Sequence, residues 1–165
     1  KNESVEQRSA RLLAEPHHPT TLLKNNMLDA GKVAPDDKCS CHHLVEGRGK
    51  RIKNQMTGKW VQSPAAVQAR KKIHAVGIGK NDEANGVWLP AYMKYVPHWF
   101  MPNAMPHANV HTVAYEEHVR DMLEPRNDEH SIRTALAVIE KQLQDGELRH
   151  VLTTKSQAKF EARMA

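Results

Sequence analysis

The sequence lacks any uninterrupted apolar run of about 18 residues, the length that a membrane-spanning helix needs. Residues 1–15 also lack the apolar centre of a secretory signal peptide, and no initiator Met begins the chain. We therefore expect no membrane-spanning segment, and we expect the chain to be a piece of a longer protein.

Cysteine is scarce, since Cys39 and Cys41 are the only two among 165 residues. Their close spacing is poor geometry for a mutual disulfide, which favours a reducing compartment. A closed structural zinc site formed by Cys39, Cys41, His42 and one further His is an alternative. Ligands at this spacing on one strand lack the turn that usually brings such ligands together.

Acidic residues are almost absent from residues 46–80, which contain only Glu46 against nine Lys and Arg. The whole chain has 24 Lys and Arg, 19 Asp and Glu and a net charge of +5, so the rest of the chain is net negative. Positive charge concentrated in one segment predicts a local site for a polyanion. The candidate phosphate contacts are the first cations of this segment: Arg48, Lys50, Arg51, Lys53 and Lys59.

Proline, glycine and apolar periodicity divide the chain into short elements. We expect helices at residues 4–15, 20–31, 64–77, 107–123 and 130–144, strands at 38–45 and 86–90, a loop after the first strand, and a weakly helical tail after 150. Three prolines forbid regular structure between 97 and 106, where Trp99 and Phe100 need burial. This order of short strands and several helices predicts a small α+β fold that is mostly helical.

Histidine is frequent, with 11 in the chain, so that neither an adjacent pair nor a His-x-x-x-His pair is evidence alone. His17 and His18 lie between prolines, and we expect them to be inert. On the expected helix, His107 and His111 stand one turn apart, which suits two nitrogens reaching one metal ion. Further along the same helix, Tyr115 and His118 would continue this stripe, as the wall of a site or as an exposed face.

Five motifs follow one another along the chain: Asn26-Met27-x-x-Ala30-Gly31, Cys41-His42-His43-Leu44-Val45, Ala69-Arg70-Lys71, Asn81-Asp82-x-Ala84-Asn85-Gly86-Val87-x-Leu89-Pro90 and His107-x-x-x-His111-Thr112-x-x-Tyr115. Over about residues 21–145 this order resembles the AHH family of nucleases in the HNH/endonuclease VII superfamily. That family occurs as toxin domains at the C-termini of bacterial polymorphic toxins and secretion-system effectors. The chain departs from the family pattern at Cys41, where Ala is usual, and at Glu46, where Pro is common.

The resemblance implies a ββα-metal (His-Me finger) core with additional flanking helices. It covers a domain at 21–145. Outside the resemblance we expect an N-terminal extension at 1–20 and, at 146–165, a helical tail packed on the domain. By the same analogy His42, His107 and His111 would hold one divalent metal ion, His43 would be the general base, and Asn85 would hold the strand connection or orient the base.

The roles of three further residues stay open at this point. Tyr115 and His118 would contact the substrate or lie on an exposed face. Glu46 would join the metal shell through water or balance the charge of Arg48.

Three imidazole ligands favour zinc, nickel or another transition metal, with magnesium and manganese as alternatives. A metal with open positions and a neutral imidazole can together hydrolyse a phosphodiester. We therefore expect a metal-dependent endonuclease toxin that cuts DNA with little sequence specificity. The alternatives are an RNase with the same site and a non-catalytic, zinc-stabilised nucleic-acid-binding module.

A nuclease toxin endangers the cell that makes it, so the resemblance implies a cognate immunity protein. The basic segment predicts an acidic surface on that partner, because opposite charges steer association. The resemblance also implies a larger delivery polypeptide or secretion apparatus, which would carry the domain into the cytoplasm of a target bacterial cell.

Overall fold

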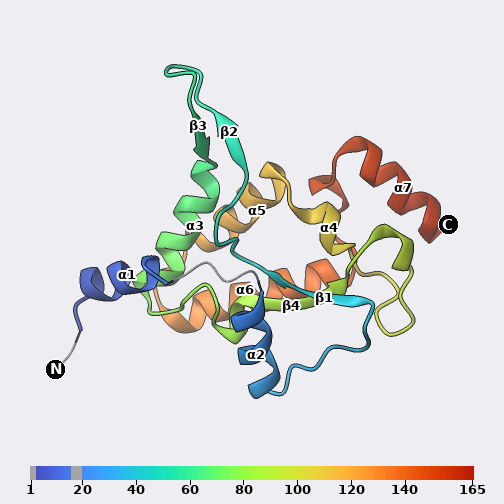
Figure 1. The fold of residues 1–165 in the computed structure, drawn as a ribbon, viewed down its shortest axis with the longest axis horizontal. Coiled ribbons are helices and arrows are strands. Elements are labelled where there is room, and N and C mark those ends of the chain that lie inside the picture. Colours follow the sequence, from blue (N-terminus) through green and yellow to red (C-terminus); the bar gives the residue numbers. More distant parts are fainter. Residues whose placement is uncertain (1–2, 16–19) are drawn as a thin grey trace.

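The computed structural model describes residues 3–15 and 20–165, so that His17 and His18 lie outside the described residues. The centre of the fold is a two-stranded antiparallel sheet of β1 (Cys39–His43) and β4 (Gly86–Pro90) (Figure 1). Both strands lie where the sequence predicts them. With helices making up most of the regular structure, the predicted α+β, mostly helical class is confirmed.

Seven α-helices surround this sheet in the described part of the chain: α1 (Val5–Leu13), α2 (Thr21–Asp29), α3 (Pro64–Ala75), α4 (His107–Val110), α5 (Val113–Leu123), α6 (Glu129–Gln144) and α7 (Thr154–Met164). Short 3-10 turns lie at Glu83–Asn85, Met93–Tyr95 and Arg149–Val151. Helices α2 and α6 pack on the sheet, while α1 and α5 pack on α3 (Figure 1). Within the described residues no helix combines the length and the apolar character needed to cross a bilayer.

Close packing joins the sheet to α2 and α6. The apolar stripe predicted for α6 is buried in the core and consists of Ile132, Leu136, Ile139 and Leu143. At the contact with α2, Gly86 of β4 lies so close to Leu23 and Met27 that a side chain at position 86 would overlap both. The absence of a side chain at Gly86 therefore lets α2 press directly on the strand that pairs with β1.

The single helix predicted at residues 107–123 is wrong, because the chain forms two helices there. Helix α4 ends at Val110, His111 leaves the helical conformation, and Thr112 is extended with φ −128° and ψ 157°. The Thr112 side chain accepts a hydrogen bond from the backbone N–H of Tyr115 and so caps α5. The predicted continuous polar stripe from His107 to His118 consequently does not exist.

The predicted burial of Trp99 and Phe100 is also wrong, because these side chains are 70% and 64% exposed. The Trp99 indole N–H donates a hydrogen bond to Asp36 Oδ2 at 2.9 Å. A polar partner at the surface thus fixes this aromatic side chain without burying it.

A β-hairpin replaces most of the loop that the sequence predicts after β1. Its strands are β2 (Arg51–Lys53) and β3 (Trp60–Gln62), which pair antiparallel and project from the body of the molecule (Figure 1). At the turn, Asn54 Oδ1 accepts hydrogen bonds from the backbone N–H groups of Met56 and Thr57. None of the six strand residues is buried, so apolar alternation could not reveal these strands.

Candidate active site

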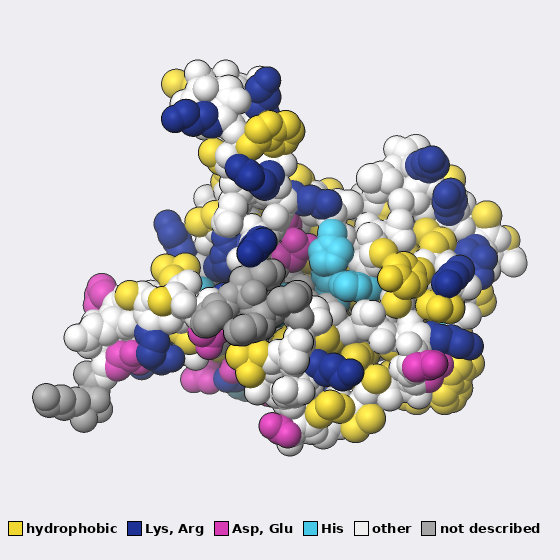
Figure 2. Space-filling model, in the orientation of Figure 1, with side chains coloured by type: hydrophobic (Ala, Val, Ile, Leu, Met, Phe, Trp, Pro, Cys, Tyr) yellow, Lys and Arg dark blue, Asp and Glu magenta, His cyan; other side chains and the backbone are white. Residues whose placement is uncertain are grey.

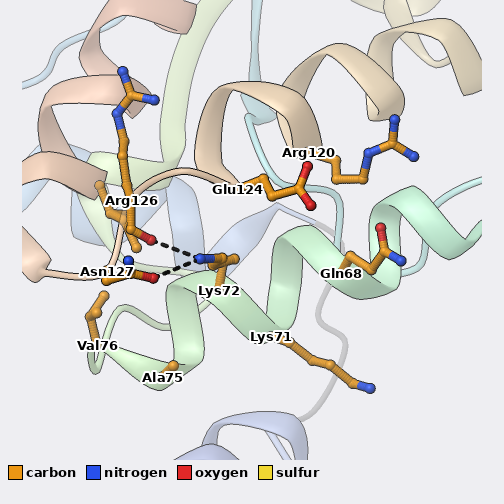
Figure 3. Close-up of a pocket in the computed structure, with 10 residues that line it drawn as sticks. Gln68, Lys71, Lys72, Ala75, Val76, Arg120, Glu124, Arg126 and Asn127 are labelled. Atoms are coloured by element: carbon orange, nitrogen blue, oxygen red, sulfur yellow. Dashed lines mark hydrogen bonds between the residues drawn. The ribbon is translucent and has the colours of Figure 1, made fainter.

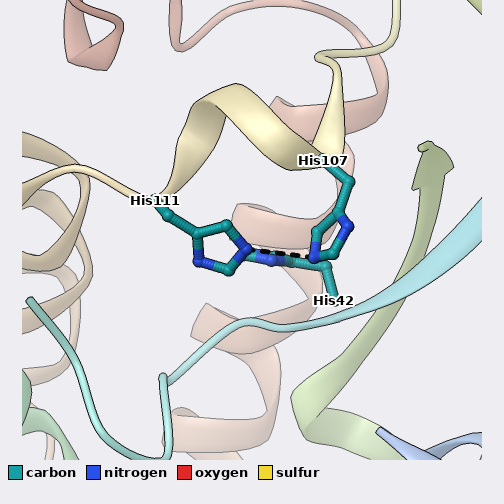
Figure 4. A group of neighbouring side chains, drawn as sticks. All are labelled: His42, His107 and His111. Atoms are coloured by element: carbon teal, nitrogen blue, oxygen red, sulfur yellow. Dashed lines mark hydrogen bonds between the residues drawn. The ribbon is translucent and has the colours of Figure 1, made fainter. Parts of the chain in front are cut away.

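Three histidines from two elements point toward one another beside the end of β1 (Figure 4). His42 lies on β1, His107 begins α4, and His111 follows the last residue of α4. Their ring centroids are 4.8 Å apart for His107 and His111, 4.9 Å for His42 and His111, and 5.2 Å for His42 and His107. One nitrogen from each ring lies within 4.8 Å of the others, so the three can converge on a single metal ion.

His42 is the most deeply buried member of this group. Its side chain is fully buried, and neither ring nitrogen has a hydrogen-bond partner among the described residues. Burial, reinforced by the neighbouring His107 and His111, lowers the pKa of His42 well below its usual value. Leaving a buried polar group unsatisfied costs about 1–3 kcal/mol, which coordination of a metal ion by this neutral imidazole would offset.

Glu46 orients one of the other two histidines. Its Oε1 accepts a hydrogen bond from His111 Nδ1 at 2.8 Å, which places the lone pair of His111 on Nε2. That nitrogen lies 3.0 Å from His107 Nε2, at the centre of the group. Burial, with the nearby His111, lowers the pKa of His107 to about 4, so this ring is also neutral near pH 7. Glu46 therefore orients the ring of His111 by a direct hydrogen bond. The sequence does not predict this contact.

His43 is the next residue on β1 and is also buried. Its Nε2 donates a hydrogen bond to Asn81 Oδ1 at 3.0 Å, and the tautomer that makes this bond carries its lone pair on Nδ1. Asn81 is absent from the residues that the sequence predicts for the site, although it stands in one of the five motifs. The sequence signal that points to Asn81 is its position as a second amide in the same motif, four residues before Asn85 in the turn that leads into β4.

Asn85 contacts the backbone rather than His43. It is fully buried, and its Oδ1 accepts from the Val45 N–H at 2.7 Å. Its Nδ2 donates to the carbonyl oxygens of Val45 at 3.0 Å and Lys80 at 2.8 Å. Asn85 thus joins the end of β1 to the turn before β4, which is one of the two roles implied by the resemblance.

The two remaining polar residues of the expected stripe lie away from the point where the three rings converge. Tyr115 is fully buried, packs its ring 5.5 Å from that of His42, and donates its hydroxyl hydrogen to the Leu44 carbonyl at 3.0 Å. His118 Nε2 donates a hydrogen bond to Gln142 Oε1 at 2.9 Å. Tyr115 therefore supports the site from within the core, and His118 contributes to the packing of α5 on α6.

A cleft of about 240 Å³ opens beside the histidines. The charged and imidazole side chains that line it are those of His43, Glu46, Arg48, His107 and His111. Figure 2 shows His side chains exposed near the centre of one face, with Lys and Arg side chains around them and along the projecting hairpin. The cleft thus brings the predicted base, two predicted metal ligands and one predicted phosphate contact together.

A larger cavity of about 520 Å³ lies between α3, α5 and the start of α6 (Figure 3). Lys72 Nζ donates there to the Arg126 carbonyl at 2.8 Å and to Asn127 Oδ1 at 3.0 Å. None of the site residues predicted from the sequence lines this cavity. The predicted chemistry therefore belongs to the smaller cleft.

The cysteine-rich zinc site considered from the sequence is not assembled among the described residues. Cys41 is buried with its Sγ 3.6 Å from the Thr20 carbonyl, whereas Cys39 Sγ lies 3.6 Å from His98 Nε2. Cys39 and Cys41 consequently belong to different surroundings, and neither is grouped with His42.

Asp36, Cys39 and His98 form a second group whose donor atoms lie close enough for a metal ion. Within it, His98 Nδ1 accepts from the Phe100 backbone N–H at 3.2 Å, so its proton is on Nε2, which donates to Asp36 Oδ2 at 3.1 Å. Burial and the Asp36 carboxylate raise the pKa of the Cys39 thiol to about 11. Hydrogen bonds thus join His98 to Asp36 in this second group, and Cys39 Sγ lies beside the same ring.

The described fold and its site define a small α+β domain with a three-histidine donor set and a fourth histidine, His43, in the cleft beside it. A family model described as a nuclease family of the HNH/ENDO VII superfamily with conserved AHH matches residues 23–151. The chain belongs to this AHH nuclease family, and Cys41-His42-His43 contains the two histidines of the AHH motif. No curated protein and no solved structure gave a match. Family membership supports a nuclease activity and therefore a nucleic-acid substrate.

Proposed function

We propose that this chain is a metal-dependent endonuclease that hydrolyses phosphodiester bonds of DNA with little sequence specificity. The observation that carries the proposal is the shared cleft, in which His43 lies beside the partly exposed rings of His107 and His111. A general base and a metal centre must act on the same phosphate, so they must be reached from one opening. Membership of the AHH nuclease family supports the same reaction.

The three-histidine group fits a divalent ion, and His42, His107 and His111 would hold it. The unsatisfied nitrogens of His42 and the orientation of His111 by Glu46 both suit this role. When bound, the ion would neutralise charge on the phosphoryl oxygens and stabilise the departing oxygen. An all-imidazole donor set favours zinc, nickel or another transition metal over magnesium or manganese.

The protein residues would supply the proton transfer and the positioning. His43 Nδ1 would take the proton from the attacking water, since the hydrogen bond to Asn81 fixes the tautomer and the ring orientation. Asn85 would hold the end of β1 and hence the position of His43. Arg48, which lines the cleft, would neutralise a neighbouring phosphate.

A non-catalytic zinc-binding module is the second candidate. A structural zinc site usually has four protein ligands and is closed, whereas a catalytic site has three and keeps a position for substrate or water. The His42 group contains three residues and borders a cleft, which favours catalysis.

The decisive comparison uses plasmid DNA and total RNA, each incubated with the purified protein with and without a chelator. We expect the plasmid to be nicked and linearised, and the chelator to stop this. Re-addition of zinc, nickel, manganese or magnesium would identify the ions that restore cutting. RNA cleavage without DNA cleavage would assign the site to RNA instead. Metal-dependent folding without cleavage of either polymer would favour the binding module.

We further propose that the chain acts as a toxin in competition between bacteria. By analogy with the family's toxin domains, a longer polypeptide or secretion apparatus would deliver it into the cytoplasm of a target cell. A cognate immunity protein with an acidic surface would cover the basic face. Charge reversal at Lys50 and Arg51 should weaken that complex, and a complex indifferent to both salt and these changes would contradict the proposed surface.

A further inference from the structure

The hairpin that the sequence does not predict is an exposed, positively charged projection. We call residues 50–63 the hairpin arm. No Asp or Glu occurs between residues 47 and 62. The two most exposed large apolar side chains of the arm are Met56 at the tip, which is 96% exposed, and Trp60, which is 60% exposed. Such side chains on a cationic projection indicate a surface for a partner that is both anionic and able to stack.

The strand register sorts these side chains between the two faces of the arm. Successive side chains of a strand point to opposite faces, and directly paired residues share a face. Arg51 pairs with Gln62, Ile52 with Val61, and Lys53 with Trp60. One face therefore carries Arg51, Lys53, Trp60 and Gln62, and the other carries Ile52 and Val61. Cations and the exposed indole consequently occupy one side.

Buried contacts at the base of the arm connect this side to the active-site cleft. Arg70 is buried and donates one guanidinium hydrogen bond to Gln62 Oε1 and another, at 2.8 Å, to the Glu46 carbonyl. The Ser63 N–H donates to the Lys50 carbonyl at 2.7 Å and closes the base of the hairpin. Glu46 lines the cleft, so Arg70 joins the charged face of the arm directly to the wall of the site.

We propose that the hairpin arm enters a groove of double-stranded DNA next to the scissile phosphate, with Trp60 and Met56 against the bases and Lys53 and Lys59 against the two backbones. This inference rests on the proposed nuclease function and names its substrate as duplex DNA. The major groove of B-form DNA, about 12 Å wide, admits a two-stranded β-ribbon. Exposed apolar side chains can pack against base edges in that groove, and Lys and Arg contacts with phosphate are independent of sequence.

The same geometry argues against duplex RNA. The major groove of A-form RNA is deep and narrow, so side chains cannot read it and a ribbon does not fit. A hairpin of this kind therefore distinguishes the two duplexes by shape and needs no base-specific hydrogen bonds.

The test measures binding in a His43→Ala background, which would prevent cleavage during the measurement. Fluorescence anisotropy would give the Kd of the metal-loaded protein for a 20-base-pair DNA duplex, the matching RNA duplex and the single DNA strand. Loss of the large Trp60 contact should weaken binding of Trp60→Ala to the DNA duplex by about tenfold. The matched control is Trp99→Ala, which removes another exposed tryptophan, one outside the arm, and should leave the affinity unchanged.

A second variant, which keeps Trp60, tests the contribution of the lysine charges. Replacing Lys53 and Lys59 by Ala should reduce the slope of log K against log[salt] by about 2, since each phosphate contact contributes about 0.9. Replacing Lys155 and Lys159 of α7, which are also exposed, should leave the slope unchanged. Equal affinities of Trp60→Ala and Trp99→Ala for the DNA duplex would overturn the proposal. If Trp60→Ala loses as much affinity for the RNA duplex as for the DNA duplex, the assignment of the hairpin arm to DNA would be overturned.

Failure of the proposed function would appear in a different assay. Wild-type hydrolysis of bis(p-nitrophenyl) phosphate measures phosphodiester chemistry without any groove. If the metal-loaded protein leaves this ester intact and cuts no plasmid, the nuclease proposal fails, whereas the binding measurements still decide what the arm contacts.

Discussion

His43 Nε2 donates a hydrogen bond to Asn81 Oδ1 at 3.0 Å, so the amide fixes both the tautomer and the orientation of the proposed base. Asn81 lies in the turn before β4, whereas His43 ends β1. The pairing of β1 with β4, in which His43 lies opposite Gly86, brings these two parts of the chain together. The two-stranded sheet of β1 and β4 thus positions the proposed base.

Asn81→Ala should reduce nuclease activity without removing the metal site. The variant loses the acceptor that holds His43, and we expect kcat to fall about tenfold to a hundredfold, part of the full contribution of a general base. Plasmid cleavage, metal content and melting temperature would be measured together. A cleavage rate equal to that of wild type would show that the hydrogen bond does not position the base.

Asn85→Ala should instead destabilise the fold. The change removes three hydrogen bonds to the buried backbone at the end of β1, and the loss should be about 3 kcal/mol of unfolding free energy. Urea denaturation would measure it, with Asn81→Ala as the matched amide variant of smaller effect. Equal stabilities of the two variants would contradict the division of roles between these asparagines.

Glu46→Ala should weaken metal binding. Partners of metal-ligating histidines typically contribute about tenfold to a hundredfold in affinity, and Glu46 is the partner of His111. Competition with a colorimetric chelator would measure the affinity, with the exposed Glu117→Ala on α5 as control. Glu46→Gln keeps a hydrogen-bond acceptor and should recover part of the loss. If Glu46→Ala binds the ion as tightly as wild type, Glu46 does not support the site.

Acid should destabilise the metal-free protein. Burial lowers the pKa of His107 to about 4 and lowers that of His42 well below its usual value, whereas an unfolded imidazole titrates near 6.5. Between these values the unfolded chain binds more protons, so the unfolding free energy falls as the pH drops from about 6.5 toward 4. Urea denaturation in chelator at pH 7.5 and pH 5 would measure the fall.

His107→Gln should flatten this pH dependence, whereas His130→Gln, which changes an exposed residue of α6, should not. A wild-type stability that is the same at both pH values would contradict neutral, buried imidazoles in the group.

The sequence predicts those helices and strands whose residue pattern fits only one kind of secondary structure. A short apolar run ended by Pro90 predicts β4, and apolar residues at helical spacing predict α6. His107 and His111 do come together as predicted, although they reach one another across a single turn of α4 rather than along a long helix. The four-residue spacing of His107 and His111 is enough to predict their proximity, because a single helical turn brings the two side chains together.

The remaining features depend on contacts between distant segments, which sequence periodicity does not contain. Thr112 ends one helix and caps the next, and its hydroxyl also donates to the Val151 carbonyl, far along the chain. Asn81 and Asn85 are both amides in one motif, and only the packing shows which of them meets His43. The strands of the hairpin arm have three residues each and bury none of them, so the sequence pattern is too short to identify a strand.

The most direct test of the account compares wild-type protein with His43→Ala on supercoiled plasmid DNA, each loaded with the same metal ion. If His43 is the general base, the variant should keep its metal content and melting temperature while cleavage falls about a hundredfold to ten-thousandfold. His130→Ala should cut at the wild-type rate. Cleavage by His43→Ala at the wild-type rate would contradict the central claim.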